Sequence, residues 1–283
     1  MASLSPSLQR LVILLLAPIL TVAGEITDNS FCTPTPVEKV TAAKEVYRGL
    51  PFAPGESSFY QVRYMGVLAG TARLEVLPPE PYSEGWLRVF RGTAHTGDWY
   101  RGIFIGHDIL ETRSRAPDFA GHSYQLVQDE GRLLGKRTRR RTELTFKQET
   151  CQVREQVIQG SKDEITDLTI APGVMDTLTT AFKLRTLSYQ PGERLRLPVY
   201  SSGKSWWLDI EVLNPTTLSV PAGTFNTIPL RLRSYLGDAL QQKGDLLVWV
   251  ANEHPQHPLI RIDAQVRVGS LHLELADFQA GIF

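Results

Sequence analysis

The sequence predicts an all-β protein, a large curved antiparallel sheet or incomplete barrel with one short helix. Three observations support this fold class. Apolar and polar residues alternate with a period of two in many segments, which is typical of strands with one buried face. Turn-forming residues separate those segments, and only one stretch has the spacing of a helix.

Alternation is clearest in five segments, which we expect to be half-buried strands. In the longest, 260–268, five apolar residues alternate with four polar or charged ones. The other four segments are 60–64, 72–76, 206–212 and 228–233. Pro229 lies inside the last of these, which favours a sheet edge or a bulge at that point.

Eight further segments are rich enough in strand-forming residues to be expected as strands. They are 86–92, 101–105, 109–115, 123–128, 142–148, 151–158, 245–251 and 271–277. Turn sequences such as Asp129-Glu130-Gly131 separate many of them. Gly66 and Gly70, inside the first hairpin, predict bulges or a close approach of another backbone.

The stretch 174–187 is the expected helix. Its apolar residues recur at roughly helical spacing, and Asp176 near its start suits a helix N-terminus. We interpret it as a connector within a single β-rich domain that covers 50–283. A division of that domain into two β halves joined near 159–190 is the alternative.

Two parts of the chain begin alike, with Pro54-Gly55-Glu56 and Pro191-Gly192-Glu193. A strand, a glycine-containing turn and a second strand follow each of them, and the second strand ends in 74–77 or 210–213. The pattern indicates a duplicated hairpin. Because Pro-Gly is also common turn chemistry, the sequence leaves both explanations open.

The first 24 residues predict a cleaved secretory signal. Arg10 precedes an apolar run from Leu11 to Ala23, which is shorter than the roughly 20 apolar residues that span a bilayer. An uncleaved anchor is the alternative. We expect residues 25–49 to form an N-terminal arm and no transmembrane segment to remain after cleavage.

Composition limits the functions open to this chain. Thirty basic residues balance thirty acidic ones, which gives no argument for a nucleic-acid partner. Outside the cytoplasm ATP and reduced nicotinamide are scarce, so we expect no cofactor.

His254 and His257 are the nearest approach to a metal site, but Pro255 and Pro258 place them in a turn, so we expect no metal.

Cys32 and Cys151 are the only cysteines, and both remain after removal of the signal. Exported compartments permit disulfides, so we expect a bond between them. Two separate thiols are the alternative.

Several motifs follow one another in order along the chain. The first group is Phe52-x-Pro54-Gly55-Glu56, Tyr60-x-Val62-x-Tyr64-x-Gly66 and Ala69-Gly70-x-Ala72. The later ones are Asp176, Gly192-Glu193, 220–225, Leu247-x-Trp249, Pro258 and Gly269. Together they resemble a bacterial exported family known only as domain of unknown function 3108, over roughly residues 50–277. The resemblance implies a β-rich exported protein of a Gram-negative envelope, hence a periplasmic location, and it implies no activity.

Residues 136–141 form the strongest local run of positive charge. On a strand, Arg137, Arg139 and Arg141 would project to one side, and Lys136 and Arg140 to the other. The three arginines are candidate contacts for anionic envelope groups such as phosphorylated lipid headgroups. A solvated hairpin that protects a sheet edge is the alternative.

Aromatic residues on apolar strand faces give the candidate ligand-binding set: Tyr64, Trp86 and Trp206. In a curved sheet such residues can line a hydrophobic cavity, although more often they fill the core.

The carboxylates of Asp108, Glu111 and Asp118 are available for chemistry, but no local motif joins them into a catalytic pair, so no catalytic residue is assigned.

These features favour an exported, non-catalytic cell-envelope protein that binds an apolar or amphipathic ligand, such as a lipid, or an envelope partner. A structural or assembly role in the envelope is the alternative, followed by an exported hydrolase. The sequence leaves the oligomeric state open.

Overall fold

The computed structural model describes residue 32 and residues 39–97, 105–131, 137–236, 239–240, 246–265 and 269–282. Most of these residues are in strands, which confirms the predicted all-β class. The signal segment 1–24, most of the arm 25–49, Lys136, most of the expected strand 101–105 and residues 266–268 lie outside the described residues. In the described part, no helix has the length and apolar character to cross a membrane.

Within the described residues, seventeen strands form one continuous sheet. They are β1 (Ser57–Tyr64), β2 (Val67–Tyr82), β3 (Gly85–Thr96), β4 (Ile105–Arg115), β5 (Gly121–Gly131), β6 (Thr138–Lys147), β7 (Gln152–Gln159), β8 (Lys162–Thr169), β9 (Met175–Asp176), β10 (Arg194–Ser201), β11 (Lys204–Val212), β12 (Thr216–Val220), β13 (Gly223–Leu236), β14 (Ala239–Leu240), β15 (Leu246–Ala251), β16 (Leu259–Gln265) and β17 (Ser270–Gln279). The helices of the described residues are η4 (Ala43–Glu45), η5 (Gln148–Thr150) and α2 (Thr177–Leu184).

The strands β8 to β1 pair in descending order, each with its neighbour in the chain. β1 also pairs with β17, and the order continues through β16, β15, β13, β11 and β10 to β9. β12 extends β11 along one side of β13, and β14 lies beside β15 on the other. Among the pairings of the described strands, that of β9 with β10 alone is parallel.

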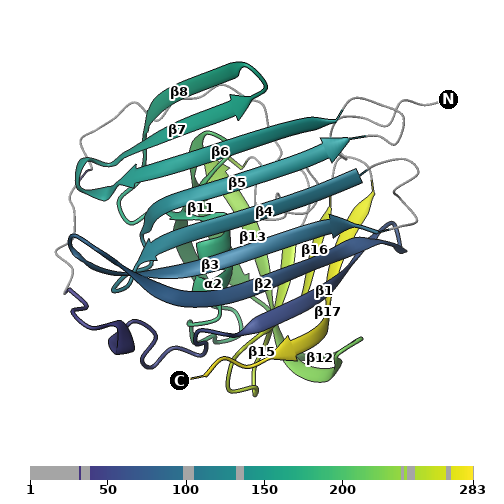
Figure 1. Cartoon of the computed structure of the whole chain (residues 1–283). Helices are drawn as coiled ribbons and strands as arrows, with labels where there is room; N and C mark the ends of the chain where they lie inside the picture. Colours follow the sequence, from purple (N-terminus) through teal and green to yellow (C-terminus); the bar gives the residue numbers. More distant parts are fainter. Residues whose placement is uncertain are drawn as a thin grey trace.

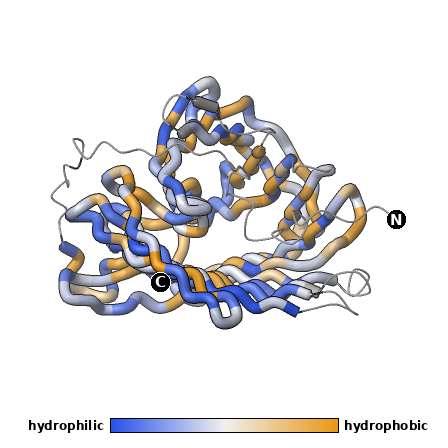
Figure 2. The backbone as a smooth tube through the Cα atoms, turned by 90° about the horizontal axis from the view of Figure 1, so that it is seen from above, coloured by the Kyte–Doolittle hydropathy of each residue, from blue (hydrophilic) through white to orange (hydrophobic). Residues whose placement is uncertain are grey.

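The sheet curls so that its two halves face each other. Figure 1 shows β1–β8, the front layer, with strands of β10–β17, the back layer, behind it and α2 between them. In Figure 2, seen from above, the front layer runs along the lower side of the view and the back layer lies above it. The sheet stays open, with β8 and β9 at its two ends.

The helix α2 forms where predicted, but it is shorter than the expected 174–187. Asp176 is its N-cap, and its Oδ1 accepts hydrogen bonds from the N–H groups of Leu178 and Thr179, both at 2.9 Å. Its Oδ2 accepts from the hydroxyls of Thr112 and Thr179. The helix starts late because Met175 and Asp176 pair with β10 as a strand, which the local sequence does not encode.

The helix joins two parts of the hydrophobic core. Ala181 and Leu184 pack into the cluster built mainly from the back layer and β1. Leu178 and Phe182 pack into the second cluster, which the front layer and the segment 46–52 form. There the ring of Phe182 stacks on Phe90 with 4.0 Å between centroids. The core therefore holds the two layers against the helix.

The two Pro-Gly-Glu segments have the same backbone structure. The N–H of Gly55 donates to Val76 O at 2.9 Å, and that of Gly192 donates to Val212 O at 2.9 Å. Val76 N–H returns to Glu56 O at 3.0 Å, and Val212 N–H returns to Glu193 O at 2.9 Å. The similarity predicted from sequence is therefore a shared hydrogen-bond pattern and not only shared turn chemistry.

The likeness extends beyond that hairpin. Each first turn has two residues of positive φ, Met65-Gly66 and Ser202-Gly203. Gly85 and Gly223, which begin β3 and β13, have φ of 138° and 134°. Positive φ also recurs just before β5 at Phe119 and before β16 at His257. We call β1–β6 the first repeat and β10–β17 the second.

The predicted close approach at Gly70 is confirmed, and Pro229 lies at a break in pairing on one side of β13 and not at a sheet edge or a bulge. A side chain at Gly70 would collide with the backbone oxygen of His95, so the expected close approach exists. Pro229 lies where the pairing of β13 passes from β12 to β11, an interruption in which a missing N–H costs little. The expected strand 109–115 is the second part of one longer strand, β4.

Candidate functional site

The three aromatic residues predicted to bind a ligand lie in different places. Tyr64 ends β1 and belongs to the core cluster of the back layer. Trp86, near the start of β3, packs against the second cluster. Trp206 is buried in β11, where its Nε1 donates to Ser201 O at 2.9 Å. The structure does not bring them into one site, so their role in ligand binding stays a prediction.

The predicted anion contacts share one exposed side of the chain at β6. Arg137 forms a two-point ion pair with Asp129, with N–O distances of 2.6 and 2.7 Å. Arg141 is paired with Glu143, and Arg139 lies opposite Asp129 in the register. Acidic neighbours therefore accompany these arginines, and the predicted anion contact stays untested.

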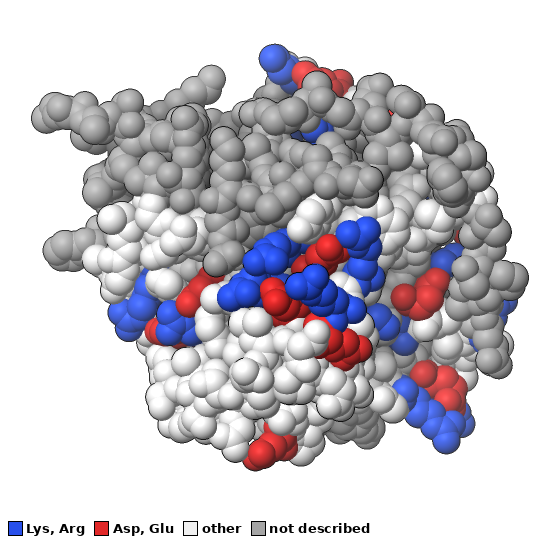
Figure 3. Space-filling model, turned by 180° about the vertical axis from the view of Figure 1, so that it is seen from behind, with Lys and Arg blue, Asp and Glu red and all other residues white. Residues whose placement is uncertain are grey.

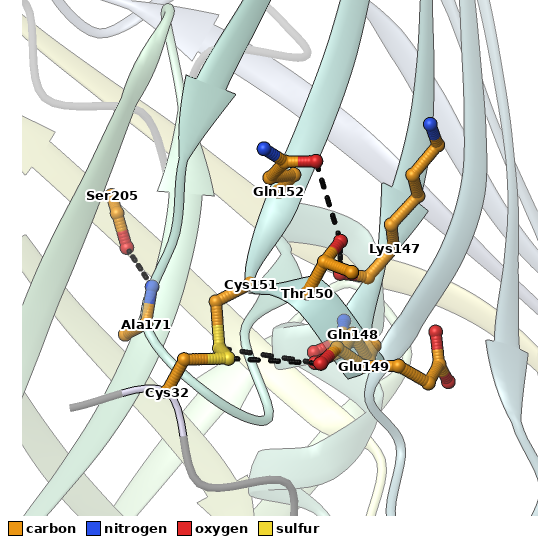
Figure 4. The surroundings of a disulfide bond; sticks show 9 residues. All are labelled: Cys32, Lys147, Gln148, Glu149, Thr150, Cys151, Gln152, Ala171 and Ser205. Carbon is orange, nitrogen blue, oxygen red and sulfur yellow. Dashed lines mark hydrogen bonds between the residues drawn. A yellow bond between two sulfur atoms is a disulfide. The ribbon is translucent and has the colours of Figure 1, made fainter. Parts of the chain in front are cut away.

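Cys32 and Cys151 form the predicted disulfide (Figure 4), with 5.8 Å between their Cα atoms. The bond attaches the N-terminal segment to the turn after β6. The sulfur contacts with the carbonyls of Glu149 and Gln148, both 3.8 Å, are close approaches only, because a bonded sulfur has no hydrogen to donate. Nearby, Ala171 N–H donates to Ser205 Oγ at 3.1 Å and links the β8–β9 connection to β11.

The two histidines of the 254–258 turn have other contacts. The ring of His254 packs edge-on against Phe278, with 5.3 Å between centroids. His257 Nδ1 lies 3.2 Å from the carbonyl oxygen of Arg185. Within the ranges that the structure describes, no group of three or more potential ligands is arranged to hold a metal ion.

The three carboxylates noted in the sequence, Asp108, Glu111 and Asp118, have different surroundings in the structure. Glu111 lies on the outer face of β4 and pairs with Arg91 and Arg113 at 2.8 and 2.7 Å. Asp118 pairs with Arg115. Asp108, by contrast, is on the inner face of β4 and only 6% exposed. The two outer carboxylates are thus neutralised, and the inner one has a different environment.

Asp108 belongs to a polar row that crosses the inner face of the front layer. The register places it opposite Gln128 of β5, and Gln128 opposite Arg140 of β6. Asp108 Oδ1 and Arg140 Nε are buried and have no hydrogen-bond partner among the residues that the structure describes. Burial raises the pKa of Asp108 to about 6, although a hydrogen bond with Gln128 opposes the shift. We call these three residues the inner polar row.

The adjoining inner-facing positions are mainly apolar. Leu110, Leu126, Thr142 and Val157 form the next row across β4–β7. In the row beyond it, Glu155 accepts a hydrogen bond from the hydroxyl of Tyr200 in the back layer at 2.6 Å. The inner face therefore combines an apolar stretch with polar groups whose bonding capacity is incomplete, an arrangement that suits a molecule with an apolar and a polar part.

Sequence reasoning did not identify the inner polar row. It placed Arg140 on the opposite side of its strand from Arg139 and Arg141. The structure agrees, because Arg140 is half-buried and the other two are exposed. Sequence reasoning also noted Asp108. The missing information was the register, because the pairing of β4, β5 and β6 is what puts Asp108 and Arg140 into one row.

The fold and this inner face define a curled, open all-β protein with an amphipathic interior. The chain belongs to the family described as protein of unknown function (DUF3108), whose model matches residues 60–276, as the motifs indicated. No curated protein sequence gives a significant match to it.

Three solved structures are similar in part. A β-barrel-like protein of the domain of unknown function DUF1849 from Brucella abortus has a TM-score of 0.51 at 10% identity, over 80% of this chain and 97% of the other. This similarity concerns the fold alone. An exported protein with a YmcC-like fold from Bacteroides fragilis, so described, has a TM-score of 0.34 at 13% identity, over 81% and 98%. A protein described as a lipoprotein, from Parabacteroides distasonis, has 0.34 at 9%, over 81% and 97%.

Proposed function

We propose that this protein is an exported, periplasmic cell-envelope protein that binds an amphipathic ligand on the inner face of its curled sheet. The observation that carries the proposal is the inner polar row, where Asp108 Oδ1 and Arg140 Nε are buried without partners among the described residues, beside Leu110 and Leu126. Buried polar atoms are nearly always hydrogen-bonded, so this pair supports the binding of water or of another polar molecule at this place.

The chemistry of the row defines the ligand. A carboxylate accepts hydrogen bonds and a guanidinium donates them, so the polar part of the ligand has both a donor and an acceptor, as a zwitterionic or hydroxyl-bearing headgroup has. Its apolar part would lie against Leu110, Leu126 and Val157. Export is supported by the signal-like start of the sequence and by the disulfide between Cys32 and Cys151.

Native mass spectrometry of the protein purified from its own periplasm tests the proposal. We expect a lipid-sized mass to accompany the wild type, and Asp108→Asn combined with Arg140→Met to remove most of it. Glu111→Gln, on the outer face of the same strand, is the matched control and should retain the ligand. A wild type that carries no such mass, or equal loss in the control, would contradict the proposal and favour a structural role.

A further inference from the structure

The outer face of the back layer has a groove of about 190 Å³ across β10, β11 and β13. Four arginines line it: Arg194, Arg196, Arg231 and Arg233. Asp209 and Glu211 are the acidic residues of the lining, and Tyr235 adds an aromatic ring. Figure 3 shows the central group of basic and acidic side chains on this side of the molecule. We call these residues the arginine groove.

The two carboxylates do not neutralise the four arginines. Asp209 is occupied by Arg196, through two N–O contacts of 2.5 and 3.0 Å. Glu211 is shared among the other three, at 3.2 Å from Arg231, 3.7 Å from Arg233 and 4.0 Å from Arg194. One carboxylate with three guanidinium neighbours leaves about two positive charges in excess among the lining residues.

The first repeat provides a comparison within the same molecule. The shared hydrogen bonds at Val76 and Val212 align the row Ser57, Glu75, Arg91, Glu111 with the row Arg194, Glu211, Arg231, Leu247. The second repeat therefore has an arginine in place of Ser57 and a leucine in place of Glu111.

The adjacent row differs in the same direction. Phe59, Arg73 and Thr93 of the first repeat correspond to Arg196, Asp209 and Arg233 of the second. Over these seven described positions the first repeat has two arginines and two glutamates, whereas the second has four arginines and two carboxylates. At these positions the excess of positive charge is found in the groove and not in the first repeat.

Donor geometry favours an anion with several oxygens. Arg231 Nε is buried and has no partner within the described part of the chain, and the side chain of Arg194 at the groove edge is 80% exposed. A guanidinium presents five N–H donors in a planar fork that matches phosphate, and a phosphomonoester has a charge of about −1.5 to −2 near neutral pH. That charge equals the excess in the groove.

We propose that the arginine groove binds a phosphate-bearing group, with Arg194, Arg231 and Arg233 as its principal contacts. The rings of Trp207 and Tyr235, each 5.9 Å from the guanidinium carbon of Arg196, flank the groove and suit an apolar portion next to the phosphate. The site is on the outer face, so it does not depend on the ligand proposed for the inner face. Its phosphate could belong to a lipid headgroup or to a soluble ester.

Two probes distinguish those sources. Titration calorimetry with glycerol 3-phosphate, a soluble phosphomonoester, measures binding of a soluble phosphate group. Co-sedimentation with phosphatidylcholine vesicles, with and without phosphatidic acid, measures binding of a phosphate at a lipid surface. Binding only to glycerol 3-phosphate assigns a soluble ester, and binding that requires phosphatidic acid assigns a headgroup. We expect either signal to weaken as salt is raised, because exposed charges are screened within about 8 Å at physiological ionic strength.

Arg194→Gln combined with Arg233→Gln should reduce the affinity at least tenfold. The matched control, Arg73→Gln with Arg91→Gln, removes the same charge from the outer face of the first repeat and should leave binding within a factor of two. Thermal melts of both variants check that they remain folded. Binding to neither probe, or equal weakening in groove and control variants, overturns the proposal.

Discussion

Arg185, which follows α2, forms a buried ion pair with Glu56, the residue just before β1 and 129 residues earlier in the chain. Two N–O contacts of 2.6 and 3.0 Å join side chains that are only 3% and 2% exposed. Arg185 also donates to the carbonyls of Gln256 and His257, at 2.7 and 3.1 Å. One guanidinium thus connects the end of the helix, the first strand and the turn before β16.

Glu56→Gln should destabilise the protein by about 3–5 kcal/mol, because it leaves the Arg185 charge buried without a counter-ion. Urea unfolding at neutral pH measures the change. Arg154→Gln is the comparison, since its ion pair with Asp167 is half exposed and solvent-screened and should contribute far less. A cost for Glu56→Gln no larger than that of Arg154→Gln would show that the buried pair is not what holds the three segments together.

Reduction of the Cys32–Cys151 bond should lower the free energy of unfolding by about 4–5 kcal/mol in the chain-entropy model, because the bond closes a loop of more than 100 residues. Urea unfolding with and without dithiothreitol measures the loss. Cys32→Ser combined with Cys151→Ser should reproduce it and should not respond to the reductant. A double variant as stable as the oxidised wild type would mean that the bond contributes nothing to the native fold.

Gly70→Ala should destabilise the protein by about 1–3 kcal/mol, because the added methyl group meets the backbone oxygen of His95, which cannot move aside as a flexible side chain can. Gly92→Ala is the matched control on the neighbouring strand. There the new Cβ would be 3.5 Å from Leu74 Cδ2, an ordinary contact, so stability should change by less than about 1 kcal/mol. Thermal melts of both variants measure these changes and test whether the backbone at Gly70 excludes a side chain.

The sequence predicted those strands that have one buried and one exposed face. It missed β8. Apolar and polar residues alternate only where one face of a strand is buried, and Lys162 to Asp167 of this edge strand are all exposed. The sequence-based prediction extended the helix to Val174 because the pairing of Met175 and Asp176 with β10 is a long-range contact. The disulfide was accessible to simple reasoning, since Cys32 had only one possible partner.

The candidate sites were less predictable than the fold. Asp108 and Arg140 come together through the register of three strands, which no local pattern specifies. The arginine groove likewise combines β10, β11 and β13, and none of these strands has a run of basic residues like that at 136–141. The excess of positive charge in the groove therefore has no local signal in the sequence.

Asp108 should make the stability of this protein depend on pH. Its pKa is raised by burial from an ordinary 3.8 to about 6, so the native state binds a proton more tightly than the unfolded chain does. Below pH 3.8, the pKa of Asp108 in the unfolded chain, the carboxyl is protonated in both states and its burial costs no stability through charge. Stability should then fall as the pH rises from 3.8 through about 6, by about 3 kcal/mol, and level off above that range.

Asp108→Asn removes this titration. The variant should be more stable than the wild type at neutral pH by about 1–3 kcal/mol, with the advantage vanishing toward pH 4 as Asp108 becomes protonated. The measurement is the difference between the free energies of unfolding of the two proteins across this range, since groups common to both cancel. A difference that does not change with pH would mean that Asp108 titrates normally and that the inner polar row is open to water.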